Sequence, residues 1–146
     1  MLLSICIVNL NAKKYLSRCL KSIPKGLKTQ DYEIIIVDNN SSDKSCSYIK
    51  NLQNKKIILI QNSYNSGYTI AINKALEKSK GENILILNPD TILEKKSIDT
   101  LLKFLKNNEN AGIVGPKVIN ELGLFQASCR RGIATPLAVF SYFLGP

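Results

Sequence analysis

Four short apolar runs, each followed by a polar segment, constrain the fold of this chain more than any other feature. The runs cover residues 3–8, 33–37, 57–60 and 84–87, and they are rich in β-branched side chains. Runs of this length that are apolar on both faces are typical of buried parallel strands. The alternation of strands with helical segments predicts a mostly parallel sheet with right-handed crossovers, in a Rossmann-like α/β/α sandwich.

The segments between the runs are long enough for crossover helices. The first helix is predicted to end at Pro24 and Gly26, and Ser41 or Ser42 to cap a second helix over residues 44–52. A third helix is expected from residue 69 to residue 80, before Gly81, and a fourth between residues 98 and 105. The predicted apolar face of the first helix consists of Tyr15, Leu16, Cys19, Leu20 and Ile23.

The pattern changes after residue 107. Residues 112–115 suggest a fifth strand, and residues 117–128 suggest a hairpin with its turn near residues 120–123. An apolar run after residue 134 is too short to cross a bilayer. We therefore expect one domain over residues 1–131, incomplete at its C-terminal end, and an apolar tail over residues 132–146.

The chain contains no histidine. This excludes Ser-His-Asp and Cys-His nucleophile pairs, His-ligated zinc and His proton shuttles, so acid, base or metal chemistry must rest on other side chains. The four cysteines are scattered without a C-x-x-C pair, and Cys6 and Cys19 read as small core residues. Without a signal peptide pattern or a membrane-spanning run, a cytoplasmic protein with free thiols is expected.

The formal net charge is +9, and the basic residues are unevenly placed. Six cations precede the first acidic residue, Asp31; they are Lys13, Lys14, Arg18, Lys21, Lys25 and Lys28. Such a basic face can attract an anionic ligand or a membrane surface, or it can be an ordinary solvated helix face. Nucleic acid is not an expected partner, because no aromatic residues alternate with the basic ones.

Polar side chains follow the carboxyl ends of the predicted strands, where ligands bind in open parallel sheets. No G-x-G-x-x-G turn follows the first strand, and no G-x-x-x-x-G-K-[ST] loop occurs. Asp90, with Asn88 beside it, suits Mg²⁺ or Mn²⁺, although Asn-Pro-Asp is also a common turn sequence. Residues 65–73 open a helix that can receive a phosphate, or that is simply capped by Asn65 or Ser66.

Four segments taken together resemble the nucleotide-sugar domain of family 2 glycosyltransferases, which have the GT-A fold. They are SICIVNLN at 4–11, EIIIVDNNSSD at 33–43, NSGYTIAINKA at 65–75 and GENILILNPD at 81–90. The resemblance extends from Leu3 to about Arg131. The Asn-Pro-Asp form and the stretch GPKVINELGLFQASCRR at 115–131 are most similar to the bacterial rhamnosyltransferase branch.

The resemblance implies inverting transfer of a sugar, with rhamnose as one candidate, from a dTDP- or UDP-linked donor. The acceptor would be a cell-envelope glycan or glycolipid, which places the protein in the cytoplasm or at the inner face of the membrane. A divalent cation, Mg²⁺ or Mn²⁺, would bridge the donor diphosphate and act as a Lewis acid on it.

The resemblance also assigns roles to individual residues. Asp90 would bind the cation, and Asn88 takes the first position of the family's Asp-x-Asp motif, which removes one negative charge. Arg130 and Arg131 would contact phosphate or a phosphorylated acceptor, or would be exposed basic residues. Six further residues are expected to contact the nucleotide or to shape its pocket: Asp38 and Asn39 at the base and ribose, Val8 and Asn9 at the base pocket, and Gly67 and Asn73 at its floor.

An inverting transfer needs a general base near the acceptor hydroxyl. In the resembling family this base is a carboxylate well downstream of the metal motif, whereas the last acidic residue of this chain is Glu121. The sequence therefore identifies no catalytic base. It predicts either the donor-binding part of a truncated transferase, or a non-catalytic remnant that binds a nucleotide or a partner protein.

Overall fold

The computed structural model describes residues 1–126 of the chain. Two compact units are distinguished, residues 1–100 and residues 101–146, and the boundary falls inside helix α4, Ser97–Asn107. The predicted domain boundary at residue 131 and the apolar tail lie outside the described residues and stay predictions.

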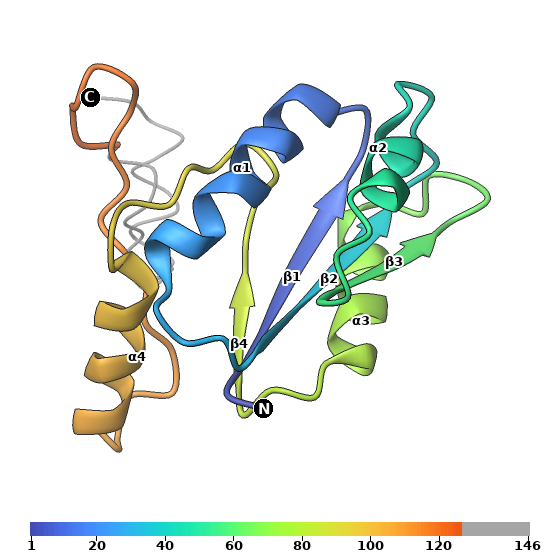
Figure 1. Ribbon diagram of the computed structural model, residues 1–146. Coiled ribbons are helices and arrows are strands. Elements are labelled where there is room, and N and C mark those ends of the chain that lie inside the picture. The colour runs from blue at the N-terminus through green and yellow to red at the C-terminus, as the bar shows by residue number, and fades with distance from the viewer. Residues whose placement is uncertain (127–146) are drawn as a thin grey trace, which may run out of the picture. The chain divides into compact units, whose positions relative to one another are not determined.

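The first unit is built on a four-stranded parallel sheet in the order β3-β2-β1-β4 (Figure 1). This confirms the predicted parallel sheet with crossover helices. The strands are β1 Leu3–Asn9, β2 Tyr32–Asp38, β3 Ile57–Gln61 and β4 Asn83–Ile86, and the helices between them are α1 Lys13–Gly26, α2 Ser45–Asn51 and α3 Tyr68–Lys78.

Helices cover both faces of the sheet. Helices α1 and α2 lie on one side, and α3 lies on the other (Figure 1). Because alternate strand residues point to opposite faces, Cys6 and Val8 of β1 reach α3 together with Ile35 and Val37 of β2. These four side chains pack against Ala71, Ile72 and Ala75 of α3. The result is the predicted α/β/α sandwich.

Only the two central strands are buried on both faces. All seven residues of β1 and of β2 are buried, as predicted. The edge strands β3 and β4 carry no fully buried residue, which contradicts the prediction for them. Ile84 and Ile86 are 48% and 53% exposed on the face that α3 covers elsewhere. An edge strand has one neighbour only, so an apolar sequence does not by itself ensure burial.

Several predicted helix ends differ from the structure. Helix α2 begins after Lys44, which has a left-handed φ of 65° and gives no side-chain cap, so the predicted caps at Ser41 and Ser42 are wrong. Helix α1 ends at Gly26, as predicted, with Pro24 in its last turn, whereas α3 ends at Lys78, before the predicted residue 80. Tyr15, predicted on the apolar face of α1, is 52% exposed.

The second unit contains less regular structure than predicted. Residues 112–115 form no strand, and Ile113 is 93% exposed. The predicted hairpin is present as one antiparallel bridge between Ile119 and Phe125, closed by a turn in which Gly123 N–H donates to Asn120 O at 2.9 Å.

Cys6 and Cys19 are fully buried, as predicted, and they and Cys46 are free thiols. Cys129 lies outside the described residues. Among residues 1–126 no helix has the length and apolar character needed to cross a bilayer.

Candidate functional site at the carboxyl rim of the sheet

Strand register brings the predicted site residues to one edge of the sheet. Asn9 of β1 is paired with Asp38 of β2, and Asp38 is paired with Gln61 of β3. Because these strands are parallel, their carboxyl ends meet at this edge, which we call the rim. The chain continues from β4 into the Asn88–Asp90 turn at the same edge, after Leu87 N–H donates to Cys6 O at 2.9 Å.

The Asp38 carboxylate is buried at the rim and held by hydrogen bonds. It is 1% exposed; Oδ2 accepts from Asn9 Nδ2 at 2.7 Å, and Oδ1 accepts from Ser41 N–H at 2.8 Å. Burial raises the pKa of Asp38, but hydrogen bonds from Ser41, Asn9 and Cys46 outweigh that effect and bring the pKa below its usual value. Asp38 is therefore ionised at neutral pH.

Asn9 presents an unused acceptor beside this carboxylate. Its Nδ2 donates to Asp38 and, at 3.1 Å, to Ser41 Oγ. Its Oδ1 is buried and has no hydrogen-bond partner among the residues described. A buried acceptor without a partner costs free energy, and because Asn9 is 0% exposed, this cost is part of the folded chain itself.

Asn39 holds the loop that leads into α3. Its Oδ1 accepts from Asn62 Nδ2 at 2.7 Å and from Ser66 Oγ at 3.1 Å, and its Nδ2 donates to Gly67 O at 3.1 Å. Lys74 Nζ completes the network by donating to Asn62 Oδ1 at 2.6 Å. Asn39 is 2% exposed, and these bonds occupy its amide group.

The Asn88–Asp90 segment forms a turn, in which Thr91 N–H donates to Asn88 O at 3.2 Å. The Asn88 and Asp90 side chains are exposed. From the core, the thiol of Cys19 donates to Asn88 O at 3.7 Å. Burial and then the negative charge of Asp90 raise the pKa of Cys19 to about 12, so this thiol stays protonated and able to donate.

A cavity of about 540 Å³ opens beside this turn. Val8, at the end of β1, and Tyr15 and Tyr68, at the starts of α1 and α3, line it together with the turn. Its lining comprises Val8, Ala12, Tyr15, Tyr68, Asn88, Pro89 and Asp90. The apolar and aromatic side chains suit a flat ligand, and the one carboxylate suits a cation.

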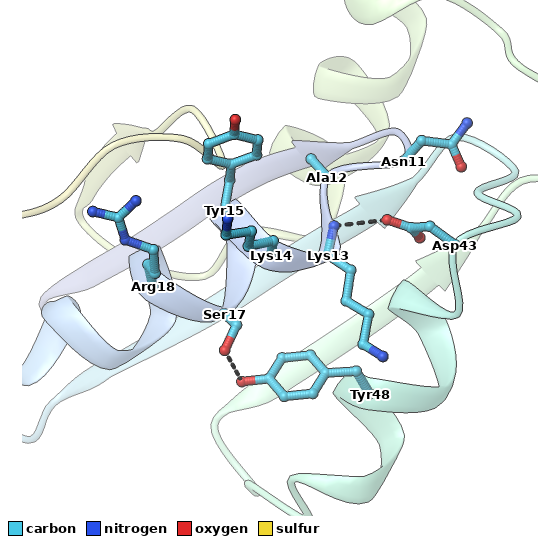
Figure 2. A pocket seen from close by; sticks show the side chains of 9 residues that line it. All are labelled: Asn11, Ala12, Lys13, Lys14, Tyr15, Ser17, Arg18, Asp43 and Tyr48. Atoms are coloured by element: carbon cyan, nitrogen blue, oxygen red, sulfur yellow. Dashed lines mark hydrogen bonds between the residues drawn. The ribbon is translucent and has the colours of Figure 1, made fainter.

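A second cavity, of about 630 Å³, lies over the start of α1 and beside α2 (Figure 2). Two hydrogen bonds join the residues that line it: the Tyr48 hydroxyl of α2 donates to Ser17 Oγ of α1 at 2.9 Å, and Asp43 Oδ2 accepts from Lys13 N–H at 2.7 Å. It contains none of the predicted site residues. We assign the candidate site to the smaller cavity, because that one contains Val8, Asn88 and Asp90.

The remaining predicted site residues that the structure describes do not line the candidate cavity. Gly67 precedes α3 with a φ of 80°, a conformation that favours glycine, and it is exposed at the rim. Asn73 is exposed on α3 and lines neither cavity. Arg130 and Arg131 lie outside the described residues.

The metal prediction rests on one carboxylate. Among residues 1–126 there is no group of three acidic or cysteine side chains that could hold a metal ion by itself. Exposed Asp90 with the Asn88 amide nevertheless fits Mg²⁺ or Mn²⁺ in a complex with a diphosphate, because such ions are held by one or two carboxylates plus phosphate oxygens and water.

Sequence reasoning missed several residues around the site. Tyr15 was assigned to the core, and Ser66 and Lys74 received no role beyond helix formation. Asn62 comes just after the apolar run 57–60, and that position is enough to place it at the rim but not to identify its partner Asn39.

Comparison with known proteins gives consistent similarities. The chain is 33% identical over 126 residues to a GalNAc(5)-diNAcBac-PP-undecaprenol beta-1,3-glucosyltransferase of Campylobacter jejuni, covering 83% of this chain and 40% of that protein. It is 32% identical over 129 residues to a poly(ribitol-phosphate) beta-glucosyltransferase of Bacillus spizizenii, covering 85% and 20%. The chain thus spans between a fifth and two fifths of the length of these two relatives.

A solved structure shares the fold. Staphylococcus aureus TarS 1-349, in complex with UDP-GlcNAc, superposes with a TM-score of 0.68 at 25% identity, covering 75% of this chain and 32% of that one. The family model described as "Glycosyl transferase family 2" matches residues 4–133. With this match over nine tenths of its length, and with the rim and turn in the places that its motifs predicted, the chain belongs to glycosyl transferase family 2.

Proposed function

We propose that this chain binds a nucleoside diphosphate sugar at the rim of its sheet and forms the donor-binding part of a glycosyltransferase. The observation that supports this most is the cavity that Val8, two tyrosines and the exposed Asp90 line together. The apolar and aromatic side chains suit a planar base, and the carboxylate suits a divalent cation that would supply positive charge beside a diphosphate.

The rim residues have separable roles in this proposal. Asp38 and Asn39, expected to contact base and ribose, also position their neighbours: Asp38 fixes Asn9, and Asn39 fixes Gly67. A UDP- or dTDP-linked donor is the proposed class, supported by the structurally similar TarS, which was solved in complex with UDP-GlcNAc.

Asp90 would hold Mg²⁺ or Mn²⁺, with Asn88 as a neutral second ligand. When bound, the ion would neutralise the charge that develops on the departing diphosphate. The Cys19 thiol, which donates to the Asn88 carbonyl, keeps the turn against α1 so that the Asp90 side chain stays directed to solvent.

For the complete reaction we propose inverting transfer of a sugar, with rhamnose among the candidates, to a glycan or glycolipid acceptor of the cell envelope. The named relatives support this acceptor class, since one acts on an undecaprenol-linked glycan and another on poly(ribitol-phosphate). The second candidate function, a nucleotide-binding or protein-interaction remnant, is favoured by the lining of the candidate cavity, in which Asp90 is the one carboxylate among the described residues and no second one is placed to act as a base.

Titration calorimetry with UDP and dTDP, with and without Mn²⁺, tests the donor site. We expect Mn²⁺ to strengthen binding and Asp90→Ala to weaken Mn²⁺-dependent binding by at least about tenfold, since even residues that only orient a metal ligand are worth about 10–100-fold in metal affinity. Glu82→Ala is the matched control, because Glu82 is exposed just before β4, at the opposite end of that strand.

Two results would refute the assignment: no measurable nucleotide affinity, or equal effects of the Asp90 and Glu82 variants. Sugar transfer by this chain alone, measured with dTDP- and UDP-sugars and a lipid-linked acceptor, separates the two candidate functions. Product formation would eliminate the non-catalytic remnant.

A further inference from the structure

The outer surface of α1 carries a single line of cations. Lys14, Arg18, Lys21 and Lys25 are exposed and follow the spacing i, i+4, i+7 and i+11, so they lie on one side of the helix. Lys28 continues the line just after the helix ends. We call these five residues the basic stripe; its helical part is about 16 Å long at 1.5 Å per residue.

The lysines of the basic stripe have no ionic partner among residues 1–126. The ion pair in this part of the chain joins the Met1 amino group to Asp31 at 4.0 Å. Two carboxylates bind backbone N–H groups at the ends of α1: Asp43 accepts from Lys13 N–H, and Asp99 accepts from Lys28 N–H. The four lysines of the stripe are exposed to solvent.

The first turn of α1 is rich in cations. It contains Lys13 and Lys14, has no acidic residue, and has no side-chain cap at Ala12. The negative charge that the N-terminal end of a helix favours comes from Asp43, whose Oδ2 accepts from Lys13 N–H at 2.7 Å.

Exposed apolar side chains lie at the same end of α1. Leu10 is 43% exposed and Tyr15 is 52% exposed, and both are close in sequence to Asn9, where β1 reaches the rim. Tyr15 also lines the cavity that contains Asp90. Lysines in a line, with a leucine and a tyrosine at one end, are the side chains that bind to the headgroup region of an anionic bilayer.

We propose that the basic stripe docks this chain on an anionic phospholipid bilayer, with Leu10 entering the headgroup layer and Tyr15 left at the cavity that it lines. The rim would then open next to the membrane surface, where a lipid-linked acceptor has its headgroup. The docking itself does not depend on donor binding, so it extends the proposed function without requiring it. A bilayer is favoured over nucleic acid because no aromatic residue alternates with the cations along the stripe.

Vesicle co-sedimentation of the full chain tests the proposal. We expect binding to vesicles of phosphatidylcholine mixed with phosphatidylglycerol, and none to phosphatidylcholine alone. The variant K14Q/K21Q/K25Q, which leaves Arg18 in place, should bind about 100-fold more weakly, because each cation near an anionic surface contributes about fivefold in affinity. The matched control K55Q/K78Q/K80Q removes the same net charge from exposed positions outside α1 and should change binding by less than about threefold.

Three outcomes would overturn the proposal: no binding of the wild type to anionic vesicles, equal losses in the two triple variants, or tighter binding of the stripe to a DNA duplex at equal phosphate concentration. Far-UV circular dichroism of each variant confirms folding. UDP binding measured without lipid separates a failure of this proposal from a failure of the donor site.

Discussion

Replacing Asn39 by alanine tests how the rim is held together. Asn39 makes three side-chain hydrogen bonds while 2% exposed: it accepts from Asn62 and Ser66 and donates to Gly67 O. A neutral hydrogen bond contributes about 1 kcal/mol net, and a buried group left unpaired costs more. We therefore expect Asn39→Ala to lower the free energy of unfolding by about 3 kcal/mol, which corresponds to about 150-fold in the folding equilibrium.

Urea unfolding followed by circular dichroism at neutral pH measures this loss. Asn73→Ala is the matched control, because Asn73 is exposed on α3 and makes no hydrogen bond in this network; its effect should stay below about 0.5 kcal/mol. A loss under about 1 kcal/mol for Asn39→Ala, at an unchanged dependence on urea, would show that the network does not hold the loop. Weaker nucleotide binding by Asn39→Ala than by Asn73→Ala is expected in the same experiment series.

Two further predictions concern the fold and its pH dependence. A Cβ at Gly81 would lie 2.4 Å from Ser4 N and 2.6 Å from Leu3 C, which are backbone atoms of β1, so Gly81→Ala should cost at least about 2 kcal/mol of stability in thermal unfolding. Gly112→Ala is the control and should cost almost nothing, because no atom lies within 4 Å of the added Cβ. Equal losses in the two variants would contradict the close packing of Gly81 against β1. The pKa of Asp38 is lower in the folded chain than its usual value, so ionised Asp38 stabilises the folded state. This stabilisation is complete above the pKa of the unfolded chain, about 4, and it is lost as the pH falls through the pKa of the folded chain. The stability difference between wild type and Asp38→Asn in urea should therefore shrink from pH 6 to pH 3, and a constant difference would rule out the charge as its source.

Hydrophobic patterning was sufficient to locate the strands and helices. The four strands and four helices lie within a few residues of their predicted positions, because central parallel strands need short runs that are apolar on both faces, and a helix that packs on a sheet needs an apolar face of period 3.6. Helix ends were predicted less well. Ser41 does not cap α2, because its hydroxyl accepts from Asn9 and from Asn11 N–H, partners 30 or more residues away in sequence.

The strand-end rule also located the site in part. Asn9, Asp38 and Asn62 each follow or end an apolar run, and parallel pairing brings them to one rim. The rule could not show that Asp38 and Asn39 are almost completely buried while Asp90 is exposed. Burial depends on which loops fold over a residue, and that is determined by hydrogen bonds between distant segments.

By itself, the sequence determined the fold class, the family and the set of polar residues at the rim, because these follow from local periodicity and from motifs in a given order. The tertiary structure alone decided which strands are edges, that Tyr15 leaves the core to line the cavity, and that the Cys19 thiol reaches the Asn88 carbonyl. It also showed that the exposed lysines of α1 lie along one side of the helix with no ion pair among residues 1–126. These features depend on contacts between residues far apart in the chain, and no local pattern specifies them.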